Sequence, residues 1–234
     1  MQIDAHGGAD RAHVWLFHGS GAPPDSLAGF AEARAADYHV SVPHFPGYGD
    51  TPYHPDDELA TSLEHIAAHI HDGGRRVVLI GHSFGGYRVG RLLGMLEPEL
   101  VAGIYGLGVI STLDERQREQ FEQVEAWIRE GHEVPAGLVE RWFSPDYIDA
   151  HPELLAVVTR WWARCHVEAV ARELFEPFDG GLADDLIRAS TAPMTLRVGE
   201  RDPAAPPEFT RAIAALRPDA EVELVPDAGH FLHM

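Results

Sequence analysis

Apolar runs and helical patterns alternate along the first 110 residues of this chain. Short runs rich in Val, Ile and Leu predict buried strands at residues 13–17, 39–42, 77–80 and 101–109. The segments between them repeat apolar side chains at helical spacing and predict helices at residues 26–36, 57–71 and 83–96. Strands and helices that alternate in this way are typical of a parallel sheet with helices on both faces.

The alternation stops after residue 110, and only helical patterns follow as far as about residue 190. Strand patterns then return at 194–198 and 221–225, separated by a helix pattern at 206–217. We therefore predict a doubly wound, mostly parallel α/β core made of residues 1–110 and 191–234. Residues 111–190 would form a helical cap, inserted after the sixth strand region of that core.

The pentapeptide Gly81-His82-Ser83-Phe84-Gly85 lies between a strand pattern and a helix pattern. A serine at the apex of such a sharp turn has a strained backbone, so small flanking residues are required. The turn exposes the hydroxyl at a helix N-terminus, where the helix dipole and the main-chain N–H of Phe84 can stabilise a negatively charged oxygen. We therefore predict that Ser83 is a nucleophile, that Phe84 contributes to an oxyanion hole and that His82 shapes the pocket beside them.

A nucleophilic serine needs a histidine base and an acid that orients it, here expected in the chain order serine, acid, histidine. Asp202 follows the strand pattern 194–198, and His230 follows the strand pattern 221–225. Both side chains thus leave the carboxyl ends of strands, where open α/β sheets build their sites. We predict that Asp202 is the acid and His230 the base. Three other residues remain alternatives for these roles: Asp114, Glu200 and His233.

Another Gly-rich turn, His18-Gly19-Ser20-Gly21, ends the first predicted strand. A turn in this position can donate a second main-chain N–H to the oxyanion hole, and we assign this role to Ser20. Gly19, next to it, would border the substrate pocket. Four of the five tryptophans lie in the predicted cap, and three of them are expected to line an apolar pocket for the acyl group: Trp127, Trp142 and Trp161. Packing of the cap on the sheet is the alternative role for these rings.

These motifs, together with Pro46-Gly47-Tyr48-Gly49, look like the α/β-hydrolase superfamily, and the resemblance covers nearly the whole chain. The segments 138–154 and 178–207 resemble the 3-oxoadipate enol-lactonase-like branch of ester and lactone hydrolases. The resemblance implies a serine hydrolase that cleaves a small carboxylic ester or lactone through an acyl-enzyme and uses no cofactor. A carbon–carbon bond hydrolase of the meta-cleavage type, and a hydrolase-fold receptor or regulator that binds a small molecule, remain alternatives.

The chain departs from that branch in two places. His44 stands where members usually have an aspartate, and the sequence ends four residues after His230, where members continue into a final helix that packs on the sheet. We therefore expect one face of the sheet to expose apolar surface. A second copy of the chain, in a homodimer, or a displaced segment of the cap would cover it.

The formal net charge of −19, with 18 arginines and no lysine, argues against nucleic acid or anionic membranes as partners. No signal peptide or membrane-spanning run is visible, so a cytoplasmic protein is expected, and the arginine bias suggests a bacterial source. The single cysteine, Cys165, cannot form an internal disulfide. His65 and His69 are spaced i, i+4, yet a solvated helix face explains them better than a metal site, and we expect no metal.

Overall fold

The computed structural model describes residues 1–110, 115–130, 134–176 and 184–234. Within these ranges seven strands form one sheet in the order β1-β3-β2-β4-β5-β6-β7. Their bounds are β1 Ile3–His6, β2 Ala12–Phe17, β3 Tyr38–Pro43, β4 Val77–His82, β5 Val101–Leu107, β6 Met194–Gly199 and β7 Glu221–Val225. β1 runs antiparallel to β3, and all other neighbouring strands are parallel. The predicted doubly wound, mostly parallel α/β sheet is confirmed.

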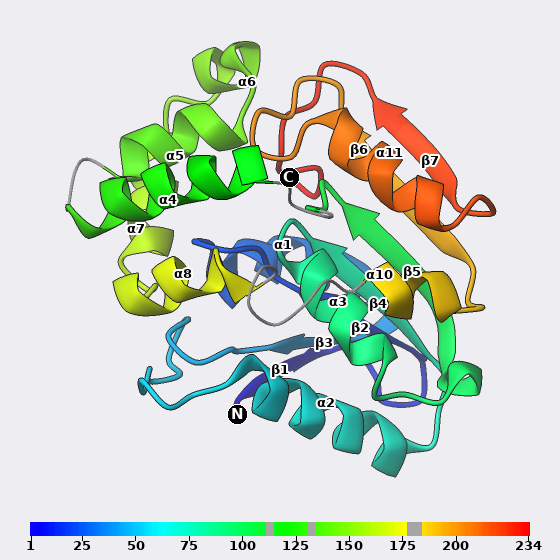
Figure 1. Cartoon of the computed structure of the whole chain (residues 1–234). Helices are drawn as coiled ribbons and strands as arrows, with labels where there is room; N and C mark the ends of the chain where they lie inside the picture. The colour runs from blue at the N-terminus through cyan, green and yellow to red at the C-terminus, as the bar shows by residue number, and fades with distance from the viewer. Residues whose placement is uncertain (111–114, 131–133, 177–183) are drawn as a thin grey trace.

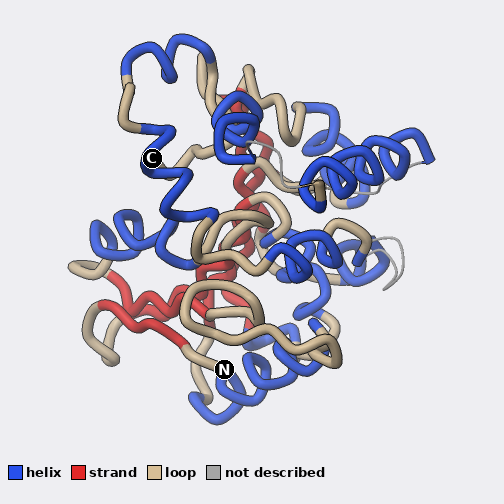
Figure 2. Tube along the Cα trace, turned by 90° about the vertical axis from the view of Figure 1, so that its left-hand side faces the viewer, coloured by secondary structure: helices blue, strands red, loops and turns tan. Residues whose placement is uncertain are grey.

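Helices cover both faces of this sheet, and the side chains of β2 show how the two faces differ. Trp15 and Phe17 point into the larger apolar cluster, which includes buried residues of α2 (Leu59–Gly73) and α3 (Gly85–Leu93). Val14 and Leu16 point to the opposite face, where α1 (Ala28–Arg34) packs. Because side chains alternate along a strand, one buried strand contributes to both layers. Figures 1 and 2 show the sheet with helices on its two sides.

The cap helices gather at one end of the sheet, above the carboxyl ends of the strands (Figure 1). They are α4 Glu115–Arg129, α5 Val134–Trp142, α6 Pro145–Ala150, α7 Leu154–Trp162 and α8 Val167–Glu173. Five strands precede this insertion, not the six strand regions expected from the sequence. The count of six was too high. The four apolar runs given above correspond to β2–β5, and the fifth strand, β1, is a short and half-exposed edge strand that no apolar run predicted.

One helix of the predicted cap packs on the core instead. In α10 (Asp184–Ala189), Ile187 joins the larger apolar cluster, and the side chain of Leu186 lies against Gly94 at the end of α3. α11 (Pro207–Leu216) follows β6 and packs on the same face through Ile213. The predicted cap boundary at residue 190 is therefore too late, because a helical pattern does not reveal which neighbour the helix packs against.

The face of the sheet that α1 covers carries an open groove of about 460 Å³. Its lining includes Phe30, Val40, Val78, Ile80, Leu107 and Leu232. No described residue of the cap lines this groove, so the option of a displaced cap segment over this face is wrong for the part of the chain that the structure describes. Leu232, in the last turn of the chain, reaches it instead. A second copy of the chain over this groove stays a prediction.

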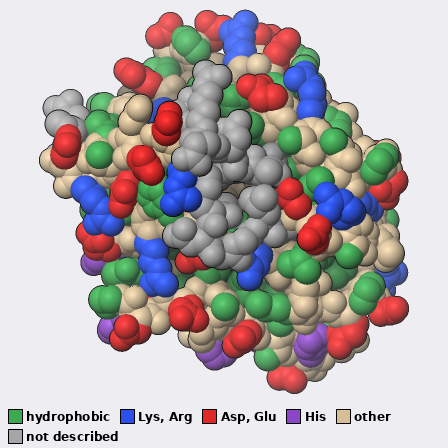
Figure 3. Space-filling view, in the orientation of Figure 1, with side chains coloured by type: hydrophobic (Ala, Val, Ile, Leu, Met, Phe, Trp, Pro, Cys, Tyr) green, Lys and Arg blue, Asp and Glu red, His purple; other side chains and the backbone are tan. Residues whose placement is uncertain are grey.

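Charged side chains are interspersed with opposite charges on the face drawn in Figure 3. Arg164 of the cap, for example, lies 2.5 Å from the carboxylate of Asp25 in the core. Within the described ranges, no helix is long and apolar enough to cross a membrane. No group of three or more His, Cys, Asp or Glu side chains in those ranges is arranged to hold a metal ion.

Candidate active site

Ser83 occupies a strained turn between β4 and α3. Its φ angle is +53°, a left-handed conformation that residues with a side chain rarely adopt. The turn closes because its neighbours lack side chains: a Cβ on Gly81 would lie 2.6 Å from the carbonyl carbon of Gly85, and one on Gly85 would lie 2.2 Å from the oxygen of Phe17. The main-chain N–H of Ser83 donates to the carbonyl of Leu107, 2.9 Å away, which ties the turn to the end of β5.

Asp202 and His230 form a buried hydrogen-bonded pair. His230 Nδ1 lies 2.8 Å from Asp202 Oδ2, and both side chains are almost fully buried. The other carboxylate oxygen, Oδ1, accepts the main-chain N–H groups of Ala204 and Ala205 at 2.9 and 2.8 Å. An ionised carboxylate only accepts hydrogen bonds, so Nδ1 carries the imidazole proton and Nε2 of the neutral ring is free to accept one.

Main-chain hydrogen bonds join the two loops that carry this pair. The N–H of Arg201, next to Asp202, donates to the carbonyl of Ala228, 3.0 Å away. Gly199, at the end of β6, packs so closely on the histidine loop that a Cβ there would lie 2.3 Å from the oxygens of Ala228 and Gly229. Asp202 and His230 are therefore held as one unit, although they are 28 residues apart in the chain.

Gly108 and His82 bring this unit next to Ser83. Gly108 follows Leu107 with a φ of +54°, and a Cβ on it would lie 2.8 Å from Asp202 Oδ2 and 3.0 Å from His230 Nδ1. The ring of His82 lies 4.8 Å from that of His230, and its Nε2 donates to the carbonyl oxygen of His230 at 3.1 Å. Asp202 and His230 are thus in direct contact, and Gly108 and His82 link this pair to the turn that carries Ser83. Ser83 Oγ and His230 Nε2 are not hydrogen-bonded to each other in the described structure, and such contacts often tighten only with substrate.

Burial lowers the pKa of His82 well below its usual value, and the neighbouring His233 and His230 lower it further. The ring is therefore neutral, and the proton on Nε2 is the one it shares with the His230 carbonyl. The predicted role of His82, which is to shape the site through hydrogen bonds, agrees with this contact.

Gly108 was not identified from the sequence, because this residue belongs to no motif. Its distinguishing feature is a positive φ angle at the end of a strand.

Ser20 and Gly19 belong to a loop that lies beside Ser83. A Cβ on Gly19 would come within 2.8 Å of the Ser83 Cβ, so the loop passes directly over the turn. The main-chain N–H groups of Ser20 and Phe84 donate to no acceptor among the described residues. Phe84 is the N-cap of α3, where free N–H groups and the helix dipole favour a negative charge. These two N–H groups are the ones that the sequence assigned to an oxyanion hole.

The three predicted pocket tryptophans pack in the cap. Trp142 is 5% exposed, and both it and Trp161 contact the ring of Phe231, at centroid distances of 5.0 and 5.5 Å. Trp142 also lies against Gly21, next to Ser20. Trp127 packs against Gly137 within the cap. Two of the three rings therefore border the residues next to His230 and Ser20, and contact with a substrate stays a prediction.

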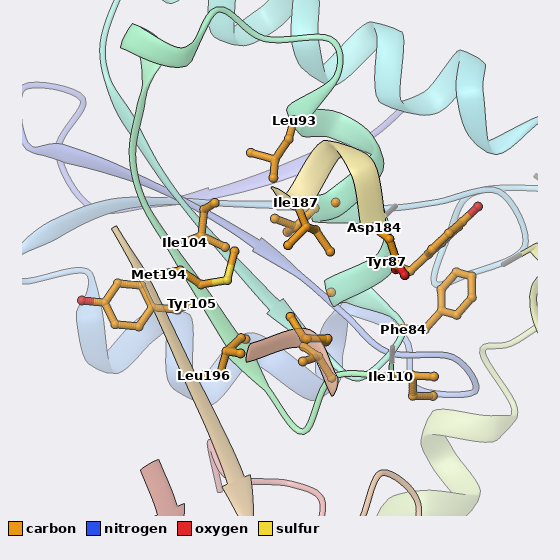
Figure 4. Close-up of a pocket in the computed structure, with 16 residues that line it drawn as sticks. Phe84, Tyr87, Leu93, Ile104, Tyr105, Ile110, Asp184, Ile187, Met194 and Leu196 are labelled. Carbon is orange, nitrogen blue, oxygen red and sulfur yellow. The ribbon is translucent and has the colours of Figure 1, made fainter. Parts of the chain in front are cut away.

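A small apolar pocket lies next to the turn that carries Ser83, between α3, β5, β6 and α10 (Figure 4). Phe84, Val109 and Leu196 contribute to its lining. Its volume is about 40 Å³, enough for a few water molecules. We interpret it as a packing gap in the core and not as a pocket for an acyl group.

The three alternatives for the acid and the base lie in different surroundings. Asp114 lies outside the described residues. Glu200 is exposed, and His233 is stacked edge-on against His82 with its pKa lowered to about 4 by burial. Burial also raises the pKa of Cys165, whose thiol donates to the carbonyl of Trp161, so this cysteine is no reactive thiolate.

The comparisons with known proteins agree with this architecture. The model of the alpha/beta hydrolase family matches residues 5–234. A thermophilic esterase from Thermogutta terrifontis is 22% identical with a TM-score of 0.84, covering 98% of this chain and 86% of that one. The enol-lactonase from Burkholderia xenovorans LB400 is 17% identical with a TM-score of 0.84, covering 98% and 89%. No curated protein matches. With the family model spanning nearly its whole length, the chain belongs to the alpha/beta hydrolase family.

Proposed function

We propose that this protein is a serine hydrolase that cleaves a small carboxylic ester or lactone through an acyl-enzyme, with no cofactor. The observation that carries the proposal is the convergence of Ser83 with the hydrogen-bonded Asp202–His230 pair at the carboxyl edge of the sheet. Two main-chain N–H groups without a described acceptor lie on either side of the serine. These are the parts that acyl transfer needs: a nucleophile, a base with its orienting acid, and donors for an oxyanion.

In the first half of the reaction, Ser83 Oγ attacks the carbonyl carbon of the substrate while Nε2 of His230 takes the hydroxyl proton. The carbonyl oxygen becomes an oxyanion and accepts hydrogen bonds from the N–H groups of Phe84 and Ser20. Asp202 holds the ring and stabilises its positive charge. The carbon–oxygen bond to the leaving group then breaks, and His230 gives its proton to the departing alkoxide.

In the second half, water attacks the acyl-enzyme with His230 again as base. The new tetrahedral intermediate collapses, Ser83 recovers its proton from His230, and a carboxylic acid leaves. With a lactone, the alcohol and the acid remain one molecule, a hydroxy acid. Each oxyanion donor in such a site typically contributes about 10²–10³-fold to turnover.

Similar structures support the choice of substrate class. They include the esterase and the enol-lactonase described above. They also include Est816, described as an N-acyl homoserine lactone degrading enzyme, which is 19% identical with a TM-score of 0.78, covering 98% of this chain and 90% of that one. The apolar rings of Trp142 and Trp161 pack on Phe231, the residue after His230, and favour an uncharged acyl group over a highly charged one.

The test is a panel of p-nitrophenyl esters of increasing acyl length together with lactones, including an N-acyl homoserine lactone. Wild-type protein is compared with Ser83→Ala. We expect hydrolysis of at least one ester or lactone by the wild type and background rates for the variant. Turnover of a vinylogous diketone without any ester would select carbon–carbon hydrolysis. Tight ligand binding without any turnover would select a receptor and overturn the proposal.

A further inference from the structure

A fully buried ion pair joins the core to the cap. Arg88 of α3 is 1% exposed and Glu173 at the end of α8 is 8% exposed, and their side chains form a salt bridge. The guanidinium also lies 3.9 Å from the ring centroid of Phe45. Removing two charges from water is costly, and a pair of apolar side chains often serves stability equally well. The pair therefore calls for a role beyond stability.

The same two side chains hold both ends of the loop that carries Ser20. Arg88 Nη1 donates to the carbonyl oxygen of His18 at 2.7 Å. Glu173 accepts a hydrogen bond from the hydroxyl of Tyr48, and that hydroxyl in turn accepts the main-chain N–H of Gly21 at 3.4 Å. The loop is thus fixed two residues before Ser20 and one residue after it, while the N–H of Ser20 itself stays free among the described residues.

The protonation states of Tyr48 and His18 determine which groups of this network donate hydrogen bonds and which carry charge. Burial and the charge of Glu173 raise the pKa of Tyr48 well above its usual value, so its hydroxyl stays protonated and donates to the carboxylate. Burial and the nearby Arg88 lower the pKa of His18 well below its usual value, so the imidazole beside Arg88 carries no second positive charge. Arg88 also lies over the ring of Phe84, 5.4 Å from its centroid, and so touches the other residue of the oxyanion hole.

We propose that Arg88 and Glu173 are positioning residues for the oxyanion hole: together they aim the N–H of Ser20 at the oxygen that the N–H of Phe84 also binds. Because Glu173 belongs to the cap, the hole is complete only while α8 is docked on the core. This inference rests on the proposed serine hydrolase function, and it adds a cap residue, Glu173, to the groups that position the oxyanion hole.

The decisive variant removes both charges at once. Arg88→Met with Glu173→Leu keeps the buried volume filled and leaves no unpaired charge, so this double variant is expected to fold, as replacements of buried ion pairs often do. Glu173→Gln alone is the second variant, because it keeps the shape and removes the charge. The matched control is Glu168→Gln on the same helix, which breaks an exposed ion pair to Arg129 inside the cap.

Three measurements distinguish a role in positioning the Ser20 N–H from a general effect on the structure. We expect kcat for an ester substrate to fall by about 10-fold to 10²-fold in the double variant, with KM little changed, because a misaimed donor loses part of what a complete donor contributes. The preference for an oxoester over the matching thionoester should shrink as well, because the sulfur of a thionoester accepts hydrogen bonds poorly. Hydrogen exchange of peptides covering residues 17–23 should become faster, while Glu168→Gln should match the wild type in all three measurements.

A folded double variant with wild-type kcat and wild-type thionoester discrimination would overturn the inference. An equal loss for oxoester and thionoester, with unchanged exchange in residues 17–23, would do the same, since it would indicate a general effect on structure. If the wild type itself turns over no ester or lactone, the proposed function fails separately. The hydrogen-exchange comparison still tests whether the pair holds the loop.

Discussion

The main-chain N–H of His230 donates a hydrogen bond to the carbonyl oxygen of Trp142, 2.8 Å away. Trp142 is the last residue of α5, so the loop that carries the proposed base is held by the backbone of the cap. Gly229 makes the approach close enough: a Cβ there would lie 2.9 Å from the oxygen of Trp142 and from the nitrogen of Ser144. The cap therefore positions the histidine as well as covering the site.

Gly229→Ala should lower kcat by about 10²-fold, because the added methyl group must push the His230 loop away from Trp142, and displacements of about 1 Å cost that much in a catalytic site. Steady-state kinetics with the best ester from the panel checks this. The control is Gly29→Ala in α1, where an added Cβ meets nothing within 4 Å. Equal kcat values for the two variants would contradict the proposed role of this contact.

Ser83→Ala should abolish labelling by a fluorophosphonate probe, because the variant lacks the hydroxyl that the Asp202–His230 pair activates. Loss of the serine or the histidine in such a unit typically lowers turnover about 10⁶-fold. Intact-mass spectrometry after incubation with the probe is the measurement. Labelling that persists in the variant at another residue would show that Ser83 has been assigned the wrong role.

Asp202→Asn should lower kcat about 10⁴-fold while the fold survives, because an amide neither holds the required tautomer of His230 nor stabilises its cation. Two nearby acids serve as matched controls with the same change of charge. Glu200→Gln alters an exposed side chain, and Asp227→Asn removes an ion pair to Arg201 at 2.8 Å. If either control loses as much activity as Asp202→Asn, the acid has been misassigned.

Stability should fall as the pH is lowered from about 6.5 to 4. Burial, with a smaller contribution from His230, lowers the pKa of His233 to about 4 from its ordinary value of 6.5. Between these values the unfolded chain binds a proton that the folded chain does not, so unfolding becomes more favourable toward acid, by about 1.4 kcal/mol per pH unit for one such histidine. Urea unfolding at pH 7 and pH 5 measures this. His233→Phe keeps a ring and should show a shallower dependence on pH, whereas an unchanged slope would contradict the assignment.

The groove beside α1 should make the protein associate with a second copy at micromolar concentration. Tyr105, which lines it, is 42% exposed. Exposed apolar surface of this kind favours association. Light scattering should show a dimer that Tyr105→Asp converts to a monomer. Leu155→Asp, at a 50% exposed position in the cap, should not have this effect. A monomeric wild type that binds no hydrophobic dye would contradict the prediction.

Local patterns in the sequence predicted most of the helices and strands, and they singled out the three residues proposed for the centre of the site. Strands reveal themselves by apolar runs and helices by a period of 3.6, and both depend on neighbours in the chain. The turn around Ser83 is local as well, because its strain requires glycines at fixed offsets such as Gly81 and Gly85. Asp202 and His230 followed from their places after strand patterns, since parallel strands bring their carboxyl ends to one edge.

Only the tertiary structure decided which side chains from distant segments meet. In the sequence Arg88 has the pattern of an ordinary helical residue. In the structure it forms an ion pair with Glu173, 85 residues away in the chain. Gly108 carries no motif, yet its missing side chain makes room for both Asp202 and His230. The packing of α10 on the core and the contact of Trp142 with His230 are of the same kind. A linear pattern records the period and polarity of each segment, whereas these contacts depend on how whole elements pack against one another, which no single segment encodes.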